Sequence, residues 1–344
     1  MSRSFDPTVG PVLVTGGSGY LGGWTVVELL RRGYRVRTTV RDLKREAEVR
    51  AVIAQKVEAG DRLSFHAADL LADRGWDEAC AGAAAVMHVA SPLPIGEFKD
   101  QDLVRPGREG VARVWRAAER AGVRHLVMTS STAAADAPLG AAGPADETVW
   151  TDPTRPGISS YARAKTLAEG DAWKLAEAAQ GRMTLATVLP GAIQGLPLGP
   201  DLGGSLEMVA RLVRGQVPAL PRISFPVVET SDVVDLHIRA LTERAAAGQR
   251  FLAASNTLWM SDMAKILKAQ LGERAHKISI KEAPDLVIRV GAFFSSEMKM
   301  VVPSLGNWTT YSAKKAERLL GWRPKSAEEA LLIAARGLIA DGLA

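Results

Sequence analysis

Short apolar segments alternate with helical patterns along the first part of this 344-residue chain. The apolar segments cover residues 11–17, 34–42, 62–70, 83–91, 125–131 and 183–193. The helical patterns that separate several of them cover residues 23–33, 109–123 and 159–179. Strands that are apolar on both faces belong in a parallel sheet covered by helices. The alternation therefore predicts an α/β fold of the Rossmann type, a doubly wound parallel sheet with helices on both faces.

The pattern changes after Pro190. Residues 191–204, GAIQGLPLGPDLGG, are rich in Gly and Pro, which predicts a long loop. The chain also exceeds the length at which one hydrophobic core stops growing, so a second lobe is expected. The predicted division is a first domain at 1–190 with a return segment at about 227–256, and a smaller C-terminal lobe at 191–226 and 257–344.

Composition and charge exclude several classes of protein. No apolar run approaches the length that spans a bilayer, so no membrane partner is expected. The first residues include no apolar signal segment and Cys80 is the only cysteine, which together predict a cytoplasmic protein without an internal disulfide. The 43 basic and 38 acidic residues are interspersed, so no nucleic-acid partner is expected. The five histidines are scattered without ligand spacing, so no metal site is expected.

A glycine-rich turn, VTGGSGYLGG, follows the first predicted strand and opens a helix. Gly16, Gly19 and Gly22 are spaced three apart, which is the spacing and context of a dinucleotide-binding turn. Glycines let the backbone turn tightly and approach a pyrophosphate, whose charge the helix N-terminus favours. The residues of this turn predicted to bind the cofactor are Gly16, Ser18, Gly19, Tyr20, Leu21 and Gly22.

Basic residues follow the second predicted strand. An NAD-binding protein carries an acidic residue there for the ribose 2′-hydroxyl, whereas an NADP-binding protein needs cations for the 2′-phosphate. Arg41 follows Val40 at this position, and Lys44 comes within one turn. A guanidinium can stack on adenine and pair with phosphate oxygens, so Arg41 and Lys44 favour NADPH. NADH remains an alternative, because the carboxylate of Asp42 could accept a hydrogen bond from a ribose 2′-hydroxyl.

Two further strand ends are expected beside the cofactor. HAADL ends the third strand where the adenine would lie, and HVASP, residues 88–92, ends the fourth beside the pyrophosphate and ribose. Asp69 could equally be an ordinary polar residue at a strand end, and His88 is expected to be packed in the core. The residues predicted to contact the cofactor here are Asp69, Leu70, Val89, Ala90 and Ser91.

A tyrosine precedes a lysine by four residues in SSYARAKTLAEG, residues 159–170. On a helix, Tyr161 and Lys165 share one face, so the phenol and the ammonium can point into one space. HLVMTSST supplies hydroxyls at the carboxyl end of the fifth strand, the edge where open α/β sheets bind ligands. A protonated tyrosine could give its proton to a carbonyl oxygen as hydride reaches the carbon, while a serine stabilises that oxygen. The Lys165 ammonium is expected to lower the tyrosine pKa from its ordinary value of about 10.

Together these motifs resemble the extended short-chain dehydrogenases/reductases, and among them the dihydroflavonol reductase and microbial aldehyde/ketone reductase branch. The resemblance is carried by VTGGSGYLGGW, GYRVRTTVRD, ADL, HVASP, VMTSS, DETVW, YARAKTLAEGDAW and LGWRP, between about residues 12 and 325. It implies Ser131 rather than Ser130 as the catalytic serine, Tyr161 as the acid and Lys165 as its partner. It also implies that the first domain binds NADPH or NADP+ and that the smaller lobe binds the substrate. Further cofactor contacts that it implies are Thr129, Tyr161, Lys165, Pro190, Ala192 and Ile193.

Two positions depart from that family. Asp136 stands where plant flavonoid reductases have an asparagine that orients the flavonoid. A carboxylate donates a hydrogen bond only when it is protonated, which argues against dihydroflavonols as substrates. Gly107 stands near the helix position where many members have an asparagine, so the proton supply would rely on lysine, ribose and water.

The smaller lobe is expected to form the substrate pocket. An apolar pocket with few charges admits aromatic or bulky apolar aldehydes and ketones. For each residue of the smaller lobe in the list that follows, packing in the core is as probable as contact with the substrate. The residues predicted to bind the substrate are Ser131, Asp136, Gln194, Leu198, Phe225, Phe293, Phe294 and Met298.

The sequence thus predicts an NADPH-dependent oxidoreductase, a reversible carbonyl reductase with a Ser–Tyr–Lys triad. Its partner is a small-molecule carbonyl substrate, and the family occurs as monomers or helix-paired homodimers. The alternatives are a nucleotide-sugar epimerase or dehydratase, a hydroxysteroid dehydrogenase-like enzyme, and a non-catalytic NADP-sensing regulator. Val40 followed by Arg41 argues against the epimerases, which favour NAD and an acid at that position. The intact Ser131, Tyr161 and Lys165 argue against the regulator.

Overall fold

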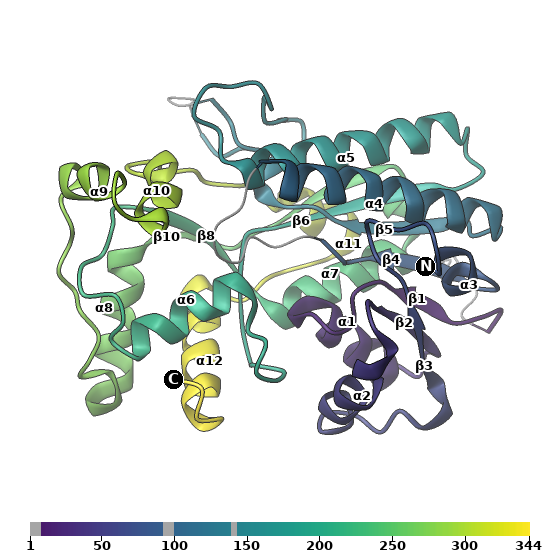
Figure 1. Cartoon of the computed structure of the whole chain (residues 1–344), viewed down its shortest axis with the longest axis horizontal. Coiled ribbons are helices and arrows are strands. Elements are labelled where there is room, and N and C mark those ends of the chain that lie inside the picture. The colour runs from purple at the N-terminus through teal and green to yellow at the C-terminus, as the bar shows by residue number, and fades with distance from the viewer. Residues whose placement is uncertain (1–7, 92–99, 139–142) are drawn as a thin grey trace.

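A parallel sheet of seven strands forms the centre of the larger part of the molecule (Figure 1). The computed structural model describes residues 8–91, 100–138 and 143–344. The sheet consists of β1 (Val12–Val14), β2 (Val36–Val40), β3 (Leu63–Ala67), β4 (Ala85–His88), β5 (His125–Thr129), β6 (Thr184–Pro190) and β9 (Gln249–Ala253). Their order is β3-β2-β1-β4-β5-β6-β9, and all neighbours run parallel. The order reverses between β1 and β4, so the predicted doubly wound Rossmann-type sheet is confirmed.

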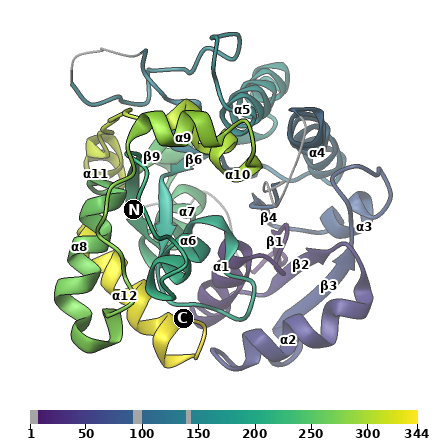
Figure 2. The same ribbon diagram turned by 60° about the vertical axis from the view of Figure 1, so that its left-hand side comes forward.

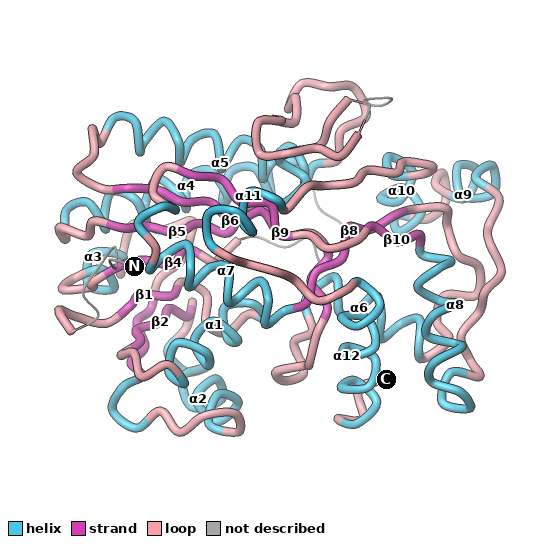
Figure 3. The backbone as a smooth tube through the Cα atoms, turned by 180° about the vertical axis from the view of Figure 1, so that it is seen from behind, coloured by secondary structure: helices cyan, strands magenta, loops and turns pink. Residues whose placement is uncertain are grey.

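Helices cover both faces of this sheet. They are α1 (Tyr20–Arg31), α2 (Glu46–Ala54), α3 (Trp76–Cys80), α4 (Asp100–Arg120), α5 (Ser160–Ala178), α7 (Thr230–Thr242) and α11 (Lys314–Leu320). Val12 and Val14 belong to the core under α1 and α7, whereas Leu13 belongs to the core under α3, α4 and α5, because successive strand side chains point to opposite faces. Figure 3 shows α7 and α11 on the face away from α4 and α5. Among the described residues, no helix is long and apolar enough to cross a membrane.

A further core lies beside the large sheet. It is built on α6 (Gly203–Val213), α8 (Met260–Leu271) and α12 (Ala327–Ala340), and α12 packs against both of the other helices (Figure 2). A small sheet of order β10-β8-β7 adjoins it, formed by β7 (Ala192–Gln194), β8 (Ser224–Glu229) and β10 (Thr257–Trp259). Two short helices, α9 (Asp285–Gly291) and α10 (Ser296–Val301), lie far from β3 and α2 (Figure 1). Tyr20, in the first turn of α1, packs against this core and against the core under α1.

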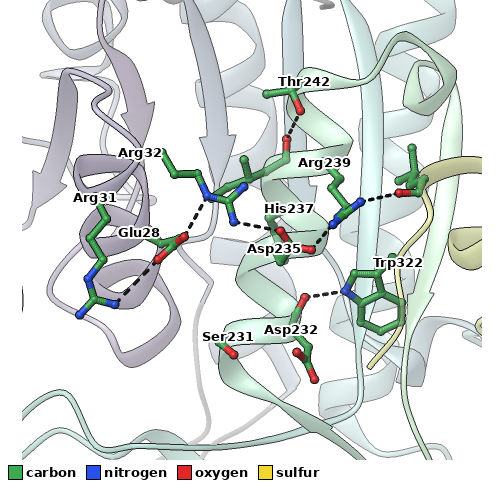
Figure 4. A network of polar contacts seen from close by, with 12 residues as sticks. Glu28, Arg31, Arg32, Ser231, Asp232, Asp235, His237, Arg239, Thr242 and Trp322 are labelled. Atoms are coloured by element: carbon green, nitrogen blue, oxygen red, sulfur yellow. Dashed lines mark hydrogen bonds and ion pairs between the residues drawn. The ribbon is translucent and has the colours of Figure 1, made fainter. Parts of the chain in front are cut away.

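A polar network ties α7 to α1 and to the segment around Trp322 (Figure 4). Arg32 forms ion pairs of 2.9 Å with Glu28 and with Asp235. The indole nitrogen of Trp322 donates a 2.8 Å hydrogen bond to the carbonyl oxygen of Asp232. These contacts hold α7 against the large sheet, although the strand that precedes it, β8, belongs to the small sheet.

Several element boundaries differ from those expected from the sequence. The helix expected at 23–33 begins at Tyr20, and the helix expected at 109–123 begins at Asp100 with Pro106 inside it. The long contact between α4 and α5 offsets the hydrogen bond that this proline removes. Residues 192–194 of the expected loop form β7, because they pair with residues 227–229 of β8, a partner that local composition does not reveal. The domain division at residue 190 stays a prediction.

Candidate active site

The glycine-rich turn between β1 and α1 is closely packed. Gly16 has a φ of +73°, and a Cβ there would lie 3.0 Å from the Cβ of Ala90. A Cβ at Gly22 would lie 2.2 Å from the carbonyl oxygen of Gly16, so both positions require glycine. Gly19 occupies the N-cap of α1 and supplies no side-chain cap. The first amides of α1 therefore suit an anion, and the turn fits the pyrophosphate of a dinucleotide.

The end of β2 presents two cations to solvent. Arg41 and Lys44, three positions apart in the chain, are both exposed. Asp42 caps the short helical turn Leu43–Arg45 by accepting a 2.9 Å hydrogen bond from the backbone amide of Lys44. The carboxylate of Asp42 thus has a local structural partner, while the two exposed cations suit a phosphate group.

The carboxyl ends of β3 and β4 border the same turn. The Asp69 carboxylate accepts a 2.8 Å hydrogen bond from the backbone amide two residues further on, which shapes the turn after β3. Leu70 packs against α4, and Ala90 contacts Gly16. Of the other residues predicted here, Val89 is buried, Ser91 is half-buried, and Pro92 lies outside the described residues.

Ser131, Tyr161 and Lys165 lie together at the carboxyl end of β5. Ser131 comes two residues after that strand and is hydrogen-bonded to the hydroxyl of Tyr161. Ser159 caps α5 by accepting a 3.1 Å hydrogen bond from the amide of Ala162, so the helix begins just ahead of the tyrosine. Nζ of Lys165 lies 5.9 Å from the centre of the Tyr161 ring. The three predicted side chains therefore surround one point at the sheet edge.

Burial is the main cause of the pKa shifts of Tyr161 and Lys165. Burial raises the pKa of Tyr161, and the hydrogen bond with Ser131 opposes that shift. The net shift of this pKa is upward and not the expected lowering, because burial outweighs the opposing effects, so Tyr161 is a protonated phenol at neutral pH. Burial lowers the pKa of Lys165 from 10.5 to about 8, against the opposing effect of the Glu169 carboxylate. A protonated phenol beside a lysine that is mainly charged at neutral pH is suited to donating a proton.

A buried ion pair holds α5 against the large sheet. Glu169 is fully buried, and Arg250 on β9 is 6% exposed, with 2.8 Å between Nε and the carboxylate. The Ser130 hydroxyl donates a 2.6 Å hydrogen bond to Glu169, so it points away from Tyr161, the partner of Ser131. Sequence reasoning missed this pair. One signal was available in the sequence, because Glu169 follows Lys165 by four residues and therefore lies on the same face of the helix.

Asp136 has a partner that sequence reasoning also missed. The hydroxyl of Tyr311 donates a hydrogen bond to the Asp136 carboxylate. Burial raises the pKa of Asp136, and the hydrogen bond from Tyr311 opposes that shift. Tyr311 lies 175 residues further along the chain and carried no local signal of this contact. The position where flavonoid reductases have an asparagine is thus a carboxylate with an internal donor.

Two predicted cofactor residues also have internal partners. The hydroxyl of Tyr20 lies 2.7 Å from the hydroxyl of Thr230 and donates a 3.0 Å hydrogen bond to the carbonyl oxygen of Leu196. The hydroxyl of Thr129 lies 2.8 Å from Nε2 of His237. Of the remaining predicted positions, Pro190 ends β6, and Ala192 and Ile193 lie half-buried in β7.

The predicted pocket residues of the smaller lobe lie in different environments. Gln194 is buried and donates a 2.9 Å hydrogen bond to the carbonyl oxygen of Ser205. Leu198 packs in the core under α1, and its predicted contact with the substrate stays a prediction. Phe225 and Met298 pack partly buried on the core of α6, α8 and α12. Phe293 and Phe294 project into solvent, at 85% and 89% exposed, and so do not form a pocket wall in this structure.

Known proteins resemble this chain along most of its length. The model of the NAD dependent epimerase/dehydratase family matches residues 12–254. Tetraketide alpha-pyrone reductase 1 of Arabidopsis thaliana is 33% identical over 276 residues, covering 77% of this chain and 82% of that protein. Dihydroflavonol 4-reductase of Zea mays is 32% identical over 272 residues, covering 77% of this chain and 75% of that protein. The structure of yeast methylglyoxal/isovaleraldehyde reductase Gre2 complexed with NADPH has a TM-score of 0.81 at 21% identity, covering 97% of this chain and 100% of that chain.

Proposed function

We propose that this chain, which belongs to the NAD dependent epimerase/dehydratase family, is an NADPH-dependent reductase of small-molecule aldehydes or ketones. The resemblance to the dihydroflavonol reductase-like extended short-chain dehydrogenases/reductases is confirmed, and so is the prediction of an oxidoreductase, because its relatives are reductases. The observation that carries the proposal is the hydrogen-bonded pair of Ser131 and Tyr161 with Lys165 one turn further along α5. The oligomeric state and the cytoplasmic location stay predictions.

The three side chains have separate roles in the proposed reaction. Bound NADPH supplies the hydride that reaches the carbonyl carbon. Tyr161 donates its proton to the carbonyl oxygen, and Ser131 donates a hydrogen bond to the same oxygen as negative charge develops there. Lys165 stabilises the phenolate that is left on Tyr161, because a positive charge nearby favours the ionised phenol. Reversal of these roles would oxidise the alcohol.

NADPH is the cofactor that the residues at the end of β2 support. Arg41 and Lys44 are exposed there, and the carboxylate of Asp42 is engaged by a backbone amide. Two cations complement the double charge of a 2′-phosphate, whereas a 2′-hydroxyl is better served by a free carboxylate. The yeast reductase of the same fold was solved as its NADPH complex.

Arg41→Ala is expected to raise KM for NADPH by about 10-fold or more, because a hydrogen bond between two charged groups is worth about 1.5 to 3 kcal/mol. KM for NADH should change less than about 2-fold, since NADH lacks the phosphate. Steady-state kinetics with both cofactors measure the difference. Arg45→Ala is the matched control, because Arg45 already pairs with Glu48 at 2.9 Å. Equal increases for both cofactors would contradict the assignment of Arg41.

The proposed substrate is an aromatic or bulky apolar carbonyl compound. Asp136 accepts a hydrogen bond from Tyr311, so it presents a carboxylate where a flavonoid would need a donor. Consumption of NADPH by aromatic aldehydes, diketones, β-keto esters and dihydroflavonols tests the substrate class. We expect kcat/KM for the best aldehyde or ketone to exceed that for dihydroflavonols by about 10-fold or more, the ratio that 1.4 kcal/mol produces.

Assays with other substrates distinguish the alternative functions. Conversion of a nucleotide sugar with tightly held NAD, and no reduction of any simple carbonyl compound, would identify an epimerase or dehydratase. Preferred oxidation of a hydroxysteroid would identify that class instead. The exposed Arg41 at the end of β2 favours the carbonyl reductase over the epimerase or dehydratase.

A further inference from the structure

The loop that carries Ser131 is anchored at both ends. Ser131 caps the short helical turn Thr132–Ala134 by accepting a 3.2 Å hydrogen bond from the amide two residues further on. At the other end, the amide of Asp136 donates a 2.7 Å hydrogen bond to the hydroxyl of Thr151. We call residues 131–136 the serine loop. Its backbone is therefore fixed to the segment that precedes α5.

Tyr311 joins two side chains of the serine loop, although it comes from the segment between α10 and α11. Its hydroxyl donates a hydrogen bond to the Asp136 carboxylate and forms a second one with the hydroxyl of Thr132. A phenol carries one hydrogen, so Thr132 is the donor in the second bond. The hydrogen bonds therefore run in one direction, from Thr132 through Tyr311 to Asp136. Thr132 directly follows Ser131 in the chain.

The place of Tyr311 is fixed by its backbone and by its ring. Ala145 donates a 2.8 Å hydrogen bond to the carbonyl oxygen of Thr310 and accepts a 2.9 Å hydrogen bond from the amide of Ser312. The ring packs on a small apolar cluster formed by Ala134, Ala135, Leu189 and Leu252. These contacts do not need the hydroxyl, so its removal should leave the fold intact.

The strength of the link depends on the charge of Asp136. Burial and the neighbouring carboxylate raise the pKa of Tyr311, so the phenol keeps its hydrogen. Burial also raises the pKa of Asp136, against the hydrogen bond from Tyr311 and the charge of Arg155. A hydrogen bond to an ionised carboxylate is about twice as strong as one between neutral groups. The link is therefore strongest when Asp136 is ionised.

Other charged groups around the serine loop have partners of their own. Arg250, on β9, donates a 3.2 Å hydrogen bond to a backbone carbonyl oxygen of the loop and is paired with the buried Glu169. The Glu147 carboxylate accepts a 3.0 Å hydrogen bond from a backbone amide of β9. The hydroxyl of Tyr311 donates to Asp136, so a pH effect that depends on this hydroxyl reports the charge of Asp136.

We propose that Tyr311 is a positioning residue of the reduction, which fixes the serine loop and thereby the place of Ser131. It does so by tying Thr132 to Asp136. The inference rests on the proposed function, because Ser131 must reach the carbonyl oxygen that Tyr161 protonates. A misplacement of about 1 Å in such a site can cost about 100-fold in rate. Tyr311 itself takes part in neither hydride nor proton transfer.

Tyr311→Phe removes the hydroxyl and keeps the ring on its apolar cluster. We expect kcat for carbonyl reduction to fall by about 10-fold, because Ser131 is less well placed. KM for the carbonyl compound and the Kd of NADPH should change less than about 2-fold, since the lost interaction acts in the transition state. Steady-state kinetics and fluorescence titration measure these quantities. Tyr34→Phe is the matched control and should leave all of them unchanged.

The pH dependence separates this role from simple packing. In the unmodified protein, protonation of Asp136 weakens the hydrogen bond from Tyr311, whereas in Tyr311→Phe there is no such bond to weaken. The ratio of the two kcat values should therefore be largest at neutral pH and decline at acidic pH, above the ordinary aspartate pKa of about 3.9. In an Asp136→Asn background, the effect of Tyr311→Phe on kcat should not depend on pH, whatever kcat that background has.

Substitutions of Thr132 test the other end of the link. Thr132→Val removes the hydroxyl with little change of shape and should lower kcat as Tyr311→Phe does. Thr132→Ser keeps a hydroxyl and should restore most of the lost kcat. The double substitution Thr132→Val with Tyr311→Phe should be no slower than Tyr311→Phe alone, because both changes remove the same link.

An unchanged kcat in Tyr311→Phe would overturn the inference. A loss of kcat that is equally large at neutral and acidic pH would also overturn it, because the hydroxyl would then act through packing. Either result leaves the proposed function intact if Tyr161→Phe is inactive. Full activity of Tyr161→Phe would instead remove the proposed mechanism itself.

Discussion

Replacing Tyr161 by phenylalanine should lower kcat for carbonyl reduction by about 100-fold to 10,000-fold, the range that a positioned proton donor contributes. The phenol is protonated and hydrogen-bonded to Ser131, so the hydroxyl is the group that this substitution removes. The ring remains, and NADPH affinity should change less than about 2-fold, since the glycine turn and Arg41 are untouched. Steady-state kinetics give kcat, and fluorescence titration gives the Kd of NADPH.

Tyr34→Phe is the matched control for this experiment. Tyr34 is half-buried just before β2 and packs on the core under α1, away from Ser131 and Lys165. Its loss of a hydroxyl should leave kcat unchanged. Turnover by Tyr161→Phe equal to that of the unmodified protein would exclude Tyr161 as the acid. Binding of NADPH without reduction of any carbonyl compound, even with Tyr161 present, would indicate a non-catalytic NADP-sensing regulator.

Arg250→Met should lower the free energy of unfolding by about 3 to 5 kcal/mol, because it leaves the buried Glu169 without its counter-charge. Arg250 also donates 2.8 Å hydrogen bonds to the carbonyl oxygens of Glu147 and Val149, and it stacks on Trp150 at 3.7 Å. The guanidinium therefore joins β9, α5 and the segment before α5. Urea unfolding at neutral pH measures the change.

Arg108→Met is the control for burial. Arg108 on α4 pairs with Asp171 on α5, the helix that also carries Glu169. The Arg108 side chain is 46% exposed, so its loss should lower the free energy of unfolding by at most about 1 kcal/mol. The double substitution Arg250→Met with Glu169→Leu should be more stable than Arg250→Met alone, since it removes the unpaired charge. A cost for Arg250→Met no larger than that for Arg108→Met would contradict the structural role of the buried pair.

Local patterns in the sequence were sufficient for the sheet and for the outline of the site. The apolar segments predicted six of the seven strands of the large sheet as a series, and the seventh, β9, contains the RFLA of the expected return segment. The three-residue spacing of Gly16, Gly19 and Gly22 predicted the turn ahead of α1. The four-residue spacing of Tyr161 and Lys165 predicted a shared helix face. Each of these features depends on backbone geometry within a few residues, which is why sequence alone could reveal it.

Tertiary structure decided which side chains meet and which protonation states result. Ser130 and Ser131 are equivalent in sequence, but the fold directs Ser130 to Glu169 and Ser131 to Tyr161. Glu169 and Arg250 are 81 residues apart, so no local pattern pairs them.

The same distinction applies to His88 and to the substrate side of the site. The sequence identified His88 only as a packed residue, and the fold brings its Nδ1 to 3.0 Å from the hydroxyl of Thr15, the residue after β1. In the same way, tertiary contacts place Leu198 in the core under α1 and bring the hydroxyl of Tyr311 to the carboxylate of Asp136. Sequence by itself determined the α/β sheet, the glycine turn and the tyrosine–lysine face, because these follow from local backbone periodicity. Only the tertiary structure decided burial, hydrogen-bond direction and charge pairing, because these depend on groups brought together from distant parts of the chain.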